Sequence, residues 1–269
     1  MIKRLKRGFA DFTRTPVWKS VFRHKMPKDP KNRALAVLTN VFLHLHPVRM
    51  RKQGLRISYT WCMGGVSFFL FLSLTVTGIL LMFYYRPTAQ HAYPDMVDLT
   101  ESATLGLMRE MHRWGAHLMV ITVWLHMLRV FLTGSYKPPR EFNWIIGVVL
   151  LVLTLLFSFT GYLLPWDQLA MWAVTVGSNM ARASPGLGVE GPGSQLMAIG
   201  DIPLITAGSD VRFVLLAGRF VGEGALLRFY VLHCIGIPFI FVMLLAAHFW
   251  RIRRDGGISG PGKGGPLAM

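Results

Sequence analysis

The sequence predicts an all-α membrane protein whose main domain is a bundle of four transmembrane helices. Hydrophobic residues make up 52% of the 269 residues and charged residues only 16%, a balance too apolar for a soluble domain of this length. Three stretches of membrane-crossing length contain no Asp, Glu, Lys or Arg. Basic residues gather at the ends of the apolar stretches, so the net charge of +16 indicates anionic lipid as a partner and not nucleic acid.

The four predicted spans cover residues 57–85, 104–132, 142–166 and 229–252. About 20 apolar residues cross a bilayer core, and the second span reaches that length only with Arg109, Glu110 and Arg113 at its outer end. The spans lie within one transmembrane domain at residues 57–254, with a long outer loop at 167–228. A basic arm at residues 1–56 precedes them and a Gly-rich tail at 255–269 follows. Helices are also expected on the membrane surface at 32–46 and in the outer loop at 168–176.

The distribution of charge predicts the orientation of the bundle. Residues 1–56 contain 15 Lys or Arg against two Asp, which places this arm on the cytoplasmic side. Four crossings return the C-terminus to the same side. We therefore expect a multi-pass protein with both termini cytoplasmic, in a bacterial cytoplasmic membrane or an equivalent energy-transducing membrane.

Histidines inside the spans carry the predicted chemistry. His112 and His126 are 14 residues apart in the second span, which puts them within about 40° of one helix face and about 21 Å apart. His233 and His248 are 15 apart in the fourth span, within about 60° and about 22 Å. Both spans run from outside to inside, so His112 pairs with His233 near the outer face and His126 with His248 near the inner face. Two axial imidazoles at each depth describe two b-type haems without an open coordination site.

A lone histidine in a membrane span is usually a satisfied structural residue, and only the match of four at two depths favours haem. His117 points about 140° away from His112 and is interpreted as structural. The remaining histidines lie outside the spans: His24, His44, His46 and His91.

Paired glycines repeat the spacing of the histidines. Gly64 and Gly78 in the first span are 14 residues apart, and so are Gly147 and Gly161 in the third. A missing Cβ lets a flat ring approach the backbone, although small residues also favour plain helix packing in membranes. Two further cofactor-binding candidates lie one turn from a histidine: Arg109 and Arg129. Each could neutralise haem propionates or act as a snorkelling anchor.

These residues occur within motifs that resemble the N-terminal, four-helix part of cytochrome b, and within it the cytochrome b6 type. The motifs are Cys62-Met-Gly-Gly, Phe83-Tyr-Tyr-Arg-Pro, Met111-His-Arg-Trp, Leu132-Thr-Gly, Lys137-Pro-Pro-Arg, Thr160-Gly-Tyr-Leu-Leu-Pro-Trp-Asp-Gln, Arg228-Phe-Tyr-Val-Leu-His and Ile258-Ser-Gly-Pro. The 15-residue spacing in the fourth span fits the b6 type.

The resemblance implies a subunit of a Rieske/cytochrome b complex, a quinol:cytochrome c or plastocyanin oxidoreductase. In that family quinol is oxidised at the outer face, and one electron crosses through the outer and inner haems to a quinone near the inner face. The implied partners are a Rieske iron–sulfur protein, a c-type cytochrome and a subunit-IV-like chain that supplies the absent Pro-Glu-Trp-Tyr motif, in a dimeric complex. This chain is therefore not expected to catalyse alone.

Cys62 matches the b6-type cysteine that holds a third haem, called c-n or c-i, through one thioether. A cysteine at such a position is otherwise simply a small hydrophobe, which is how Cys234 is interpreted. Residues 179–200 look like an insertion relative to the family. The sequence leaves two other functions open: a di-haem membrane anchor of a dehydrogenase, such as a formate dehydrogenase gamma subunit, and a non-redox membrane protein.

Overall fold

The computed structural model describes residues 28–39 and 56–258, together with residues 11, 50–51, 54 and 267–268. It divides into two units, residues 57–251 and the combined ends 1–56 and 252–269. In the unit formed by the ends, α3 (Pro30–Thr39) begins after Asp29, whose carboxylate accepts a hydrogen bond from the Asn32 N–H at 2.9 Å. The predicted surface helix overlaps α3, and its residues 40–46 lie outside the described part.

The same unit contains a two-residue antiparallel pairing. Strand β1 (Met50–Arg51) pairs with β4 (Leu267–Ala268). Two segments from opposite ends of the sequence are thereby joined by backbone hydrogen bonds.

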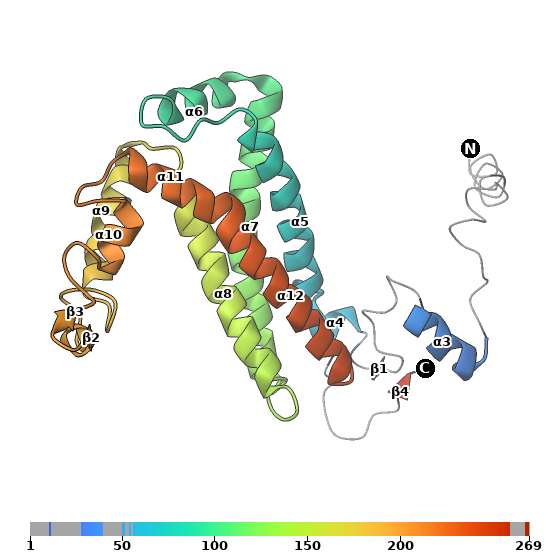
Figure 1. Ribbon diagram of the computed structural model, residues 1–269. Helices are drawn as coiled ribbons and strands as arrows, with labels where there is room; N and C mark the ends of the chain where they lie inside the picture. Colours follow the sequence, from blue (N-terminus) through green and yellow to red (C-terminus); the bar gives the residue numbers. More distant parts are fainter. Residues whose placement is uncertain are drawn as a thin grey trace. The chain divides into compact units, whose positions relative to one another are not determined.

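The larger unit confirms the predicted all-α membrane fold. Its long helices are α5 (Met63–Met82), α7 (Ala103–Leu132), α8 (Glu141–Tyr162), and α11 (Glu223–Val231) continuing into α12 (Ile237–Arg254). Within the described residues, these are the four helices that are long and apolar enough to cross a membrane. They lie alongside one another as a bundle (Figure 1). Much of their apolar surface faces outward, with Phe69, Ile121 and Met243 each more than half exposed, as a lipid environment requires.

The first predicted span is divided into two pieces. The short helix α4 (Ile57–Thr60) ends at Trp61 and Cys62, which both adopt φ of 51°. An L-residue in this left-handed region cannot continue an α-helix, so α5 starts anew at Met63. Composition alone could not reveal this break, because neither residue is glycine.

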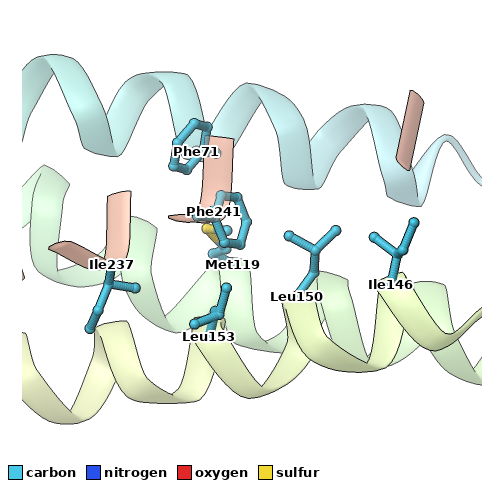
Figure 2. Packing of buried hydrophobic residues seen from close by; sticks show 7 residues of the cluster. All are labelled: Phe71, Met119, Ile146, Leu150, Leu153, Ile237 and Phe241. Atoms are coloured by element: carbon cyan, nitrogen blue, oxygen red, sulfur yellow. The ribbon is translucent and has the colours of Figure 1, made fainter. Parts of the chain in front are cut away.

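Buried apolar side chains fill the centre of the bundle between its two ends (Figure 2). Phe71 lies midway between the paired glycines of α5, and Met119 lies midway between the two histidines of α7. The Phe71 and Phe241 rings approach to 4.7 Å between centroids. The full cluster is Phe71, Met119, Ile146, Leu150, Leu153, Ile237 and Phe241. This core separates the outer and inner histidine pairs.

The connections at the predicted outer side contain several short elements. They are α6 (Ala92–Glu101), α9 (Gln168–Arg182), η3 (Ser194–Leu196), β2 (Ala198–Ile199), β3 (Ile202–Pro203) and α10 (Val211–Leu216). Helix α9 begins at the predicted residue because the Asp167 carboxylate caps it, accepting from the Ala170 N–H at 2.7 Å. It extends past the predicted end at residue 176.

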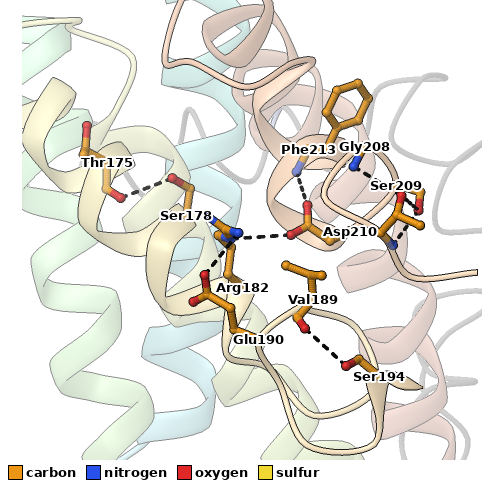
Figure 3. Close-up of polar contacts among 11 residues, drawn as sticks. Thr175, Ser178, Arg182, Val189, Glu190, Ser194, Gly208, Ser209, Asp210 and Phe213 are labelled. Carbon is orange, nitrogen blue, oxygen red and sulfur yellow. Dashed lines mark hydrogen bonds and ion pairs between the residues drawn. The ribbon is translucent and has the colours of Figure 1, made fainter. Parts of the chain in front are cut away.

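The segment 179–200, which the sequence suggested as an insertion, includes the end of α9 and packs against α10 (Figure 3). Arg182 contacts Glu190 at 3.1 Å and the buried Asp210 at 3.8 Å. Asp210 also caps α10, accepting from the Phe213 N–H at 2.8 Å. A Cβ at Gly188 would lie 1.9 Å from the Arg182 carbonyl oxygen, so only glycine allows this loop to pass so close to the helix end.

Helix α6 is held by a buried carboxylate. Asp95 accepts three hydrogen bonds from Arg86, at 2.8 Å from its backbone N–H and at 3.1 and 2.6 Å from its guanidinium. These hydrogen bonds hold the pKa of Asp95 below its ordinary value. The charged contact fixes the start of the outer loop relative to α6.

Candidate functional site: two pairs of histidines

The outer pair of predicted ligands meets across the bundle. The His112 ring on α7 and the His233 ring lie 6.3 Å apart between centroids. Two metal–nitrogen bonds of about 2 Å each, together with the half-widths of two imidazole rings, add up to about 6 Å. The spacing therefore suits a single metal ion held between these rings.

The inner pair, His126 and His248, lies on the same two helices, on the other side of the buried cluster around Phe71 and Met119. His126 and His248 are close enough to interact electrostatically, and both side chains are half-buried. The Nδ1 atoms of both rings are buried without a hydrogen-bond partner among the described residues. Buried polar atoms in proteins are normally paired, so these two nitrogens set His126 and His248 apart from most buried polar groups.

All four paired glycines face the histidine rings. A Cβ added at Gly161 would lie 2.7 Å from His233 Cε1, and one added at Gly78 would lie 3.1 Å from His112 Cε1. At the inner level the distances are 3.2 Å from Gly64 to His126 Cε1 and 3.9 Å from Gly147 to His248 Cε1. The first three are closer than ordinary contact. Helix packing alone would not require each glycine to lie opposite a different histidine ring.

A π turn explains how unequal spacings produce matched pairs. Residues Leu232–Gly236 form a π-helix, in which the Ile237 N–H donates to the Leu232 carbonyl five residues back. Pro238 has no N–H to donate four residues back, and its ring would clash with that carbonyl in a regular α-helix. The turn absorbs one residue, so the 15-residue step from His233 acts as a 14-residue step and the two rings fall within about 40° of one face.

The two arginine candidates differ in their surroundings. Arg109 forms an ion pair with Glu110 at 3.0 Å. Arg129 lies over the Tyr59 ring at 5.4 Å, and its Nε is buried without a hydrogen-bond partner among the described residues. Arg129 therefore has donor capacity directed into the protein, whereas the Arg109 charge is already compensated.

Cys62 is an exposed free thiol at the start of α5, in the left-handed conformation described above. It lies two residues before Gly64, which faces His126. A non-glycine residue with positive φ is strained, and such strain is commonly found at functional sites. Cys234 is also a free cysteine, partly buried beside His233.

The other histidines lie apart from the pairs. His117 is exposed on α7, with its ring 5.6 Å from that of Trp114. His91 precedes α6 and contacts the Thr88 hydroxyl at 2.9 Å through Nδ1. His24, His44 and His46 lie outside the described residues.

Two features of the site were missed by sequence reasoning. The hydroxyls of Thr77 and Thr160 contact His112 Nδ1 at 2.9 Å and His233 Nδ1 at 3.1 Å. The only signal in the sequence was that each threonine directly precedes a paired glycine. There is also an open pocket of about 560 Å³ in the outer loops, lined by Tyr93, Trp166, Asp167, Gln168 and Leu169.

Comparisons with known proteins identify the family of the chain. Residues 49–190 match the model of the family described as cytochrome b/b6/petB. Cytochrome b6 of Acaryochloris marina is 38% identical over 206 residues, which is 76% of this chain and 86% of that protein. The menaquinol:cytochrome c reductase cytochrome b subunit of Geobacillus thermodenitrificans is 34% identical over 248 residues, covering 92% of this chain and 93% of that protein.

A solved structure is also similar. The chain matches one from a hyperthermophilic respiratory Complex III with a TM-score of 0.65 and 27% identity. The match covers 79% of this chain and spans about half, 51%, of the solved chain.

Proposed function

The chain belongs to the cytochrome b/b6 family, and from this premise we propose that it is the di-haem subunit through which a quinol:cytochrome c or plastocyanin-type oxidoreductase moves electrons across a membrane. The family makes it a multi-pass, b-type haem-binding electron-transfer subunit of a redox complex. The observation that carries the finer proposal is the set of two imidazole pairs at two levels, each ring facing its own glycine. The cytochrome b relatives favour this function over a dehydrogenase anchor or a non-redox protein.

We assign the outer haem to His112 and His233 and the inner haem to His126 and His248. A bis-imidazole b-type haem supplies reversible one-electron transfer without binding oxygen. The 6.3 Å separation of the outer rings supports the fit of such a group. The chain's own contribution is to hold four imidazoles at fixed depth and to exclude water from the space between them.

The supporting residues follow from the same assignment. Gly64, Gly78, Gly147 and Gly161 give the flat groups room next to the backbone. Arg129 is the stronger candidate for a propionate contact, because its Nε lacks a partner among the described residues. Arg109 would have to share its charge with Glu110.

Cys62 is proposed to hold a third haem by a single thioether near the inner b-type haem. Its thiol is exposed and lies close in sequence to the glycine that faces His126. Replacing it, as in Cys62→Ser, should abolish the haem-dependent peroxidase staining of the denatured polypeptide. Staining that persists in the variant would mean that no thioether forms at Cys62.

We place quinol oxidation at the outer side and quinone reduction near the inner side, with both termini cytoplasmic. A Rieske protein and a c-type cytochrome would accept the other electron, and a subunit-IV-like chain would complete the quinol site. Basic residues flanking the spans favour contact with anionic lipid.

Spectroscopy on the purified complex tests the assignment directly. Wild-type complex should give a pyridine haemochrome spectrum with two b-type haems per chain. His126→Leu should remove the inner haem and leave the outer one, while the matched variant His117→Leu, on the same helix but outside both pairs, should keep both. A colourless wild-type preparation would end the proposal, and an unchanged spectrum in His126→Leu would refute the ligand assignment.

A further inference from the structure

The outer histidines, unlike the inner ones, are each held by a threonine hydroxyl. Thr77 Oγ1 lies 2.9 Å from His112 Nδ1, and Thr160 Oγ1 lies 3.1 Å from His233 Nδ1. Both threonines are buried, with 6% and 3% of their surface exposed. Each is followed by the glycine that faces the same ring. Each Thr-Gly dipeptide therefore provides both the space for a histidine ring and the hydrogen bond that holds this ring in place.

The hydrogen bonds around each hydroxyl determine where the protons lie. Thr77 Oγ1 donates to the Ser73 carbonyl at 2.9 Å, one turn earlier in its helix. Thr160 Oγ1 donates to the Leu156 carbonyl at 2.7 Å. A hydroxyl has a single proton, so once that proton is used on the carbonyl, Oγ1 can only accept from the imidazole. We therefore place the ring proton on Nδ1, which leaves the lone pair on Nε2.

The inner level has no such arrangement. The residues that precede Gly64 and Gly147 are Met63 and Ile146, which have no hydroxyl. The Nδ1 atoms of His126 and His248 correspondingly have no hydroxyl partner among the described residues. The two sites thus share a glycine cradle and differ in the support given to the rings.

We propose that Thr77 and Thr160 are positioning residues that lock the outer imidazoles in the Nδ1–H tautomer and make the outer and inner haems electronically unequal. This inference rests on the function proposed above. When the threonine oxygen accepts a hydrogen bond from the Nδ1–H group, the imidazole becomes a more basic ligand. A more basic ligand stabilises ferric iron and lowers the midpoint potential of the haem. The bond also fixes the rotation of each ring about its Cβ–Cγ axis, and this rotation sets the angle between the two imidazole planes.

A single hydroxyl deletion tests the proposal in the intact complex. Thr160→Val keeps the shape of the side chain and removes its hydroxyl. It should raise the midpoint potential of the outer haem and shift its low-spin electron paramagnetic resonance signal, leaving the inner haem unchanged. Thr160→Ser restores the hydroxyl and should return both readouts toward wild type.

A matched control separates this effect from loss of packing. Thr154 is on the same helix, is 2% exposed, and its hydroxyl donates to the Leu150 carbonyl. Thr154→Val should change neither the midpoint potential nor the electron paramagnetic resonance signal of either haem. Three results would overturn the inference. They are an unchanged outer-haem potential in Thr160→Val, an equal change in Thr154→Val, and a change of both haem potentials in Thr160→Val. Absence of haem from the wild-type complex would instead overturn the proposed function, so the two failures are distinguishable. If Thr160→Val does not assemble, Thr77→Val provides the same measurement from the other ligand.

Discussion

Substituting Gly161 with alanine should damage the outer histidine pair more than any equivalent substitution at the other paired glycines. The new Cβ would lie 2.7 Å from His233 Cε1, whereas ordinary contact begins at 3.4 Å. The ring or the helix must therefore retreat by 3.4 − 2.7 = 0.7 Å. A functional group must be held within about 0.5 Å of its productive position, so we expect the His233 ring to move out of ligand position.

Redox-titrated absorption spectra of the purified complex measure this effect. Gly161→Ala should lower the occupancy of the outer haem and spare the inner one. Gly65→Ala in α5, at a glycine outside the paired set, is the control, since its Cβ would meet no atom within 4 Å. If Gly161→Ala retains both haems at unchanged potentials, or if Gly65→Ala is equally damaging, the ring contacts do not determine ligand position.

Three further perturbations test other parts of the structure. Deleting Ile235 from the π turn together with Pro238→Ala should convert it to regular α-helix and preserve both haems, as their spectra would report. Loss of the outer haem would show that the turn does more than set register. Inserting one alanine after Ile235 should instead rotate His233 by about 100° and lose that haem, and full retention would contradict the role given to spacing. At the outer loop, Asp95→Asn should speed amide hydrogen exchange in α6 by removing the Arg86 contact. The pKa of Asp95 in the folded protein is lowered from 3.8. The difference in exchange rate between variant and wild type should therefore be complete above pH 3.8 and fade as the pH falls through the lower folded pKa. A difference that does not vary with pH would mean that the Asp95 carboxylate does not hold α6.

The sequence predicted the parts of the site that depend on composition and helical period. Uninterrupted apolar stretches predicted three of the four spans, because a bilayer core requires them. The second span was predicted from a shorter apolar stretch extended outward through Arg109, Glu110 and Arg113. The 14-residue step between His112 and His126 predicted their common face, since α7 is a regular helix throughout. The structure places the four paired glycines opposite the four rings, whereas the sequence could only match their spacing.

Other features depend on backbone geometry that residue periodicity does not encode. The 15-residue step from His233 to His248 suggested a 60° offset, because a regular helix was assumed where Pro238 enforces a π turn. The break at Trp61 and Cys62 was missed because neither residue favours positive φ. The hydroxyl contact of Thr160 was missed because it depends on the rotation of a single side chain.

The π turn has a consequence for how this kind of chain can change over evolutionary time. A one-codon insertion in a membrane helix ordinarily rotates everything beyond it and would separate ligands that have to act together. Here the surplus residue is confined to Leu232–Gly236, so a lineage can pass by one codon between a regular helix and this π turn while both ligands stay where they are. The fourth helix can thus vary in length between descendants that retain the same pair of electron carriers.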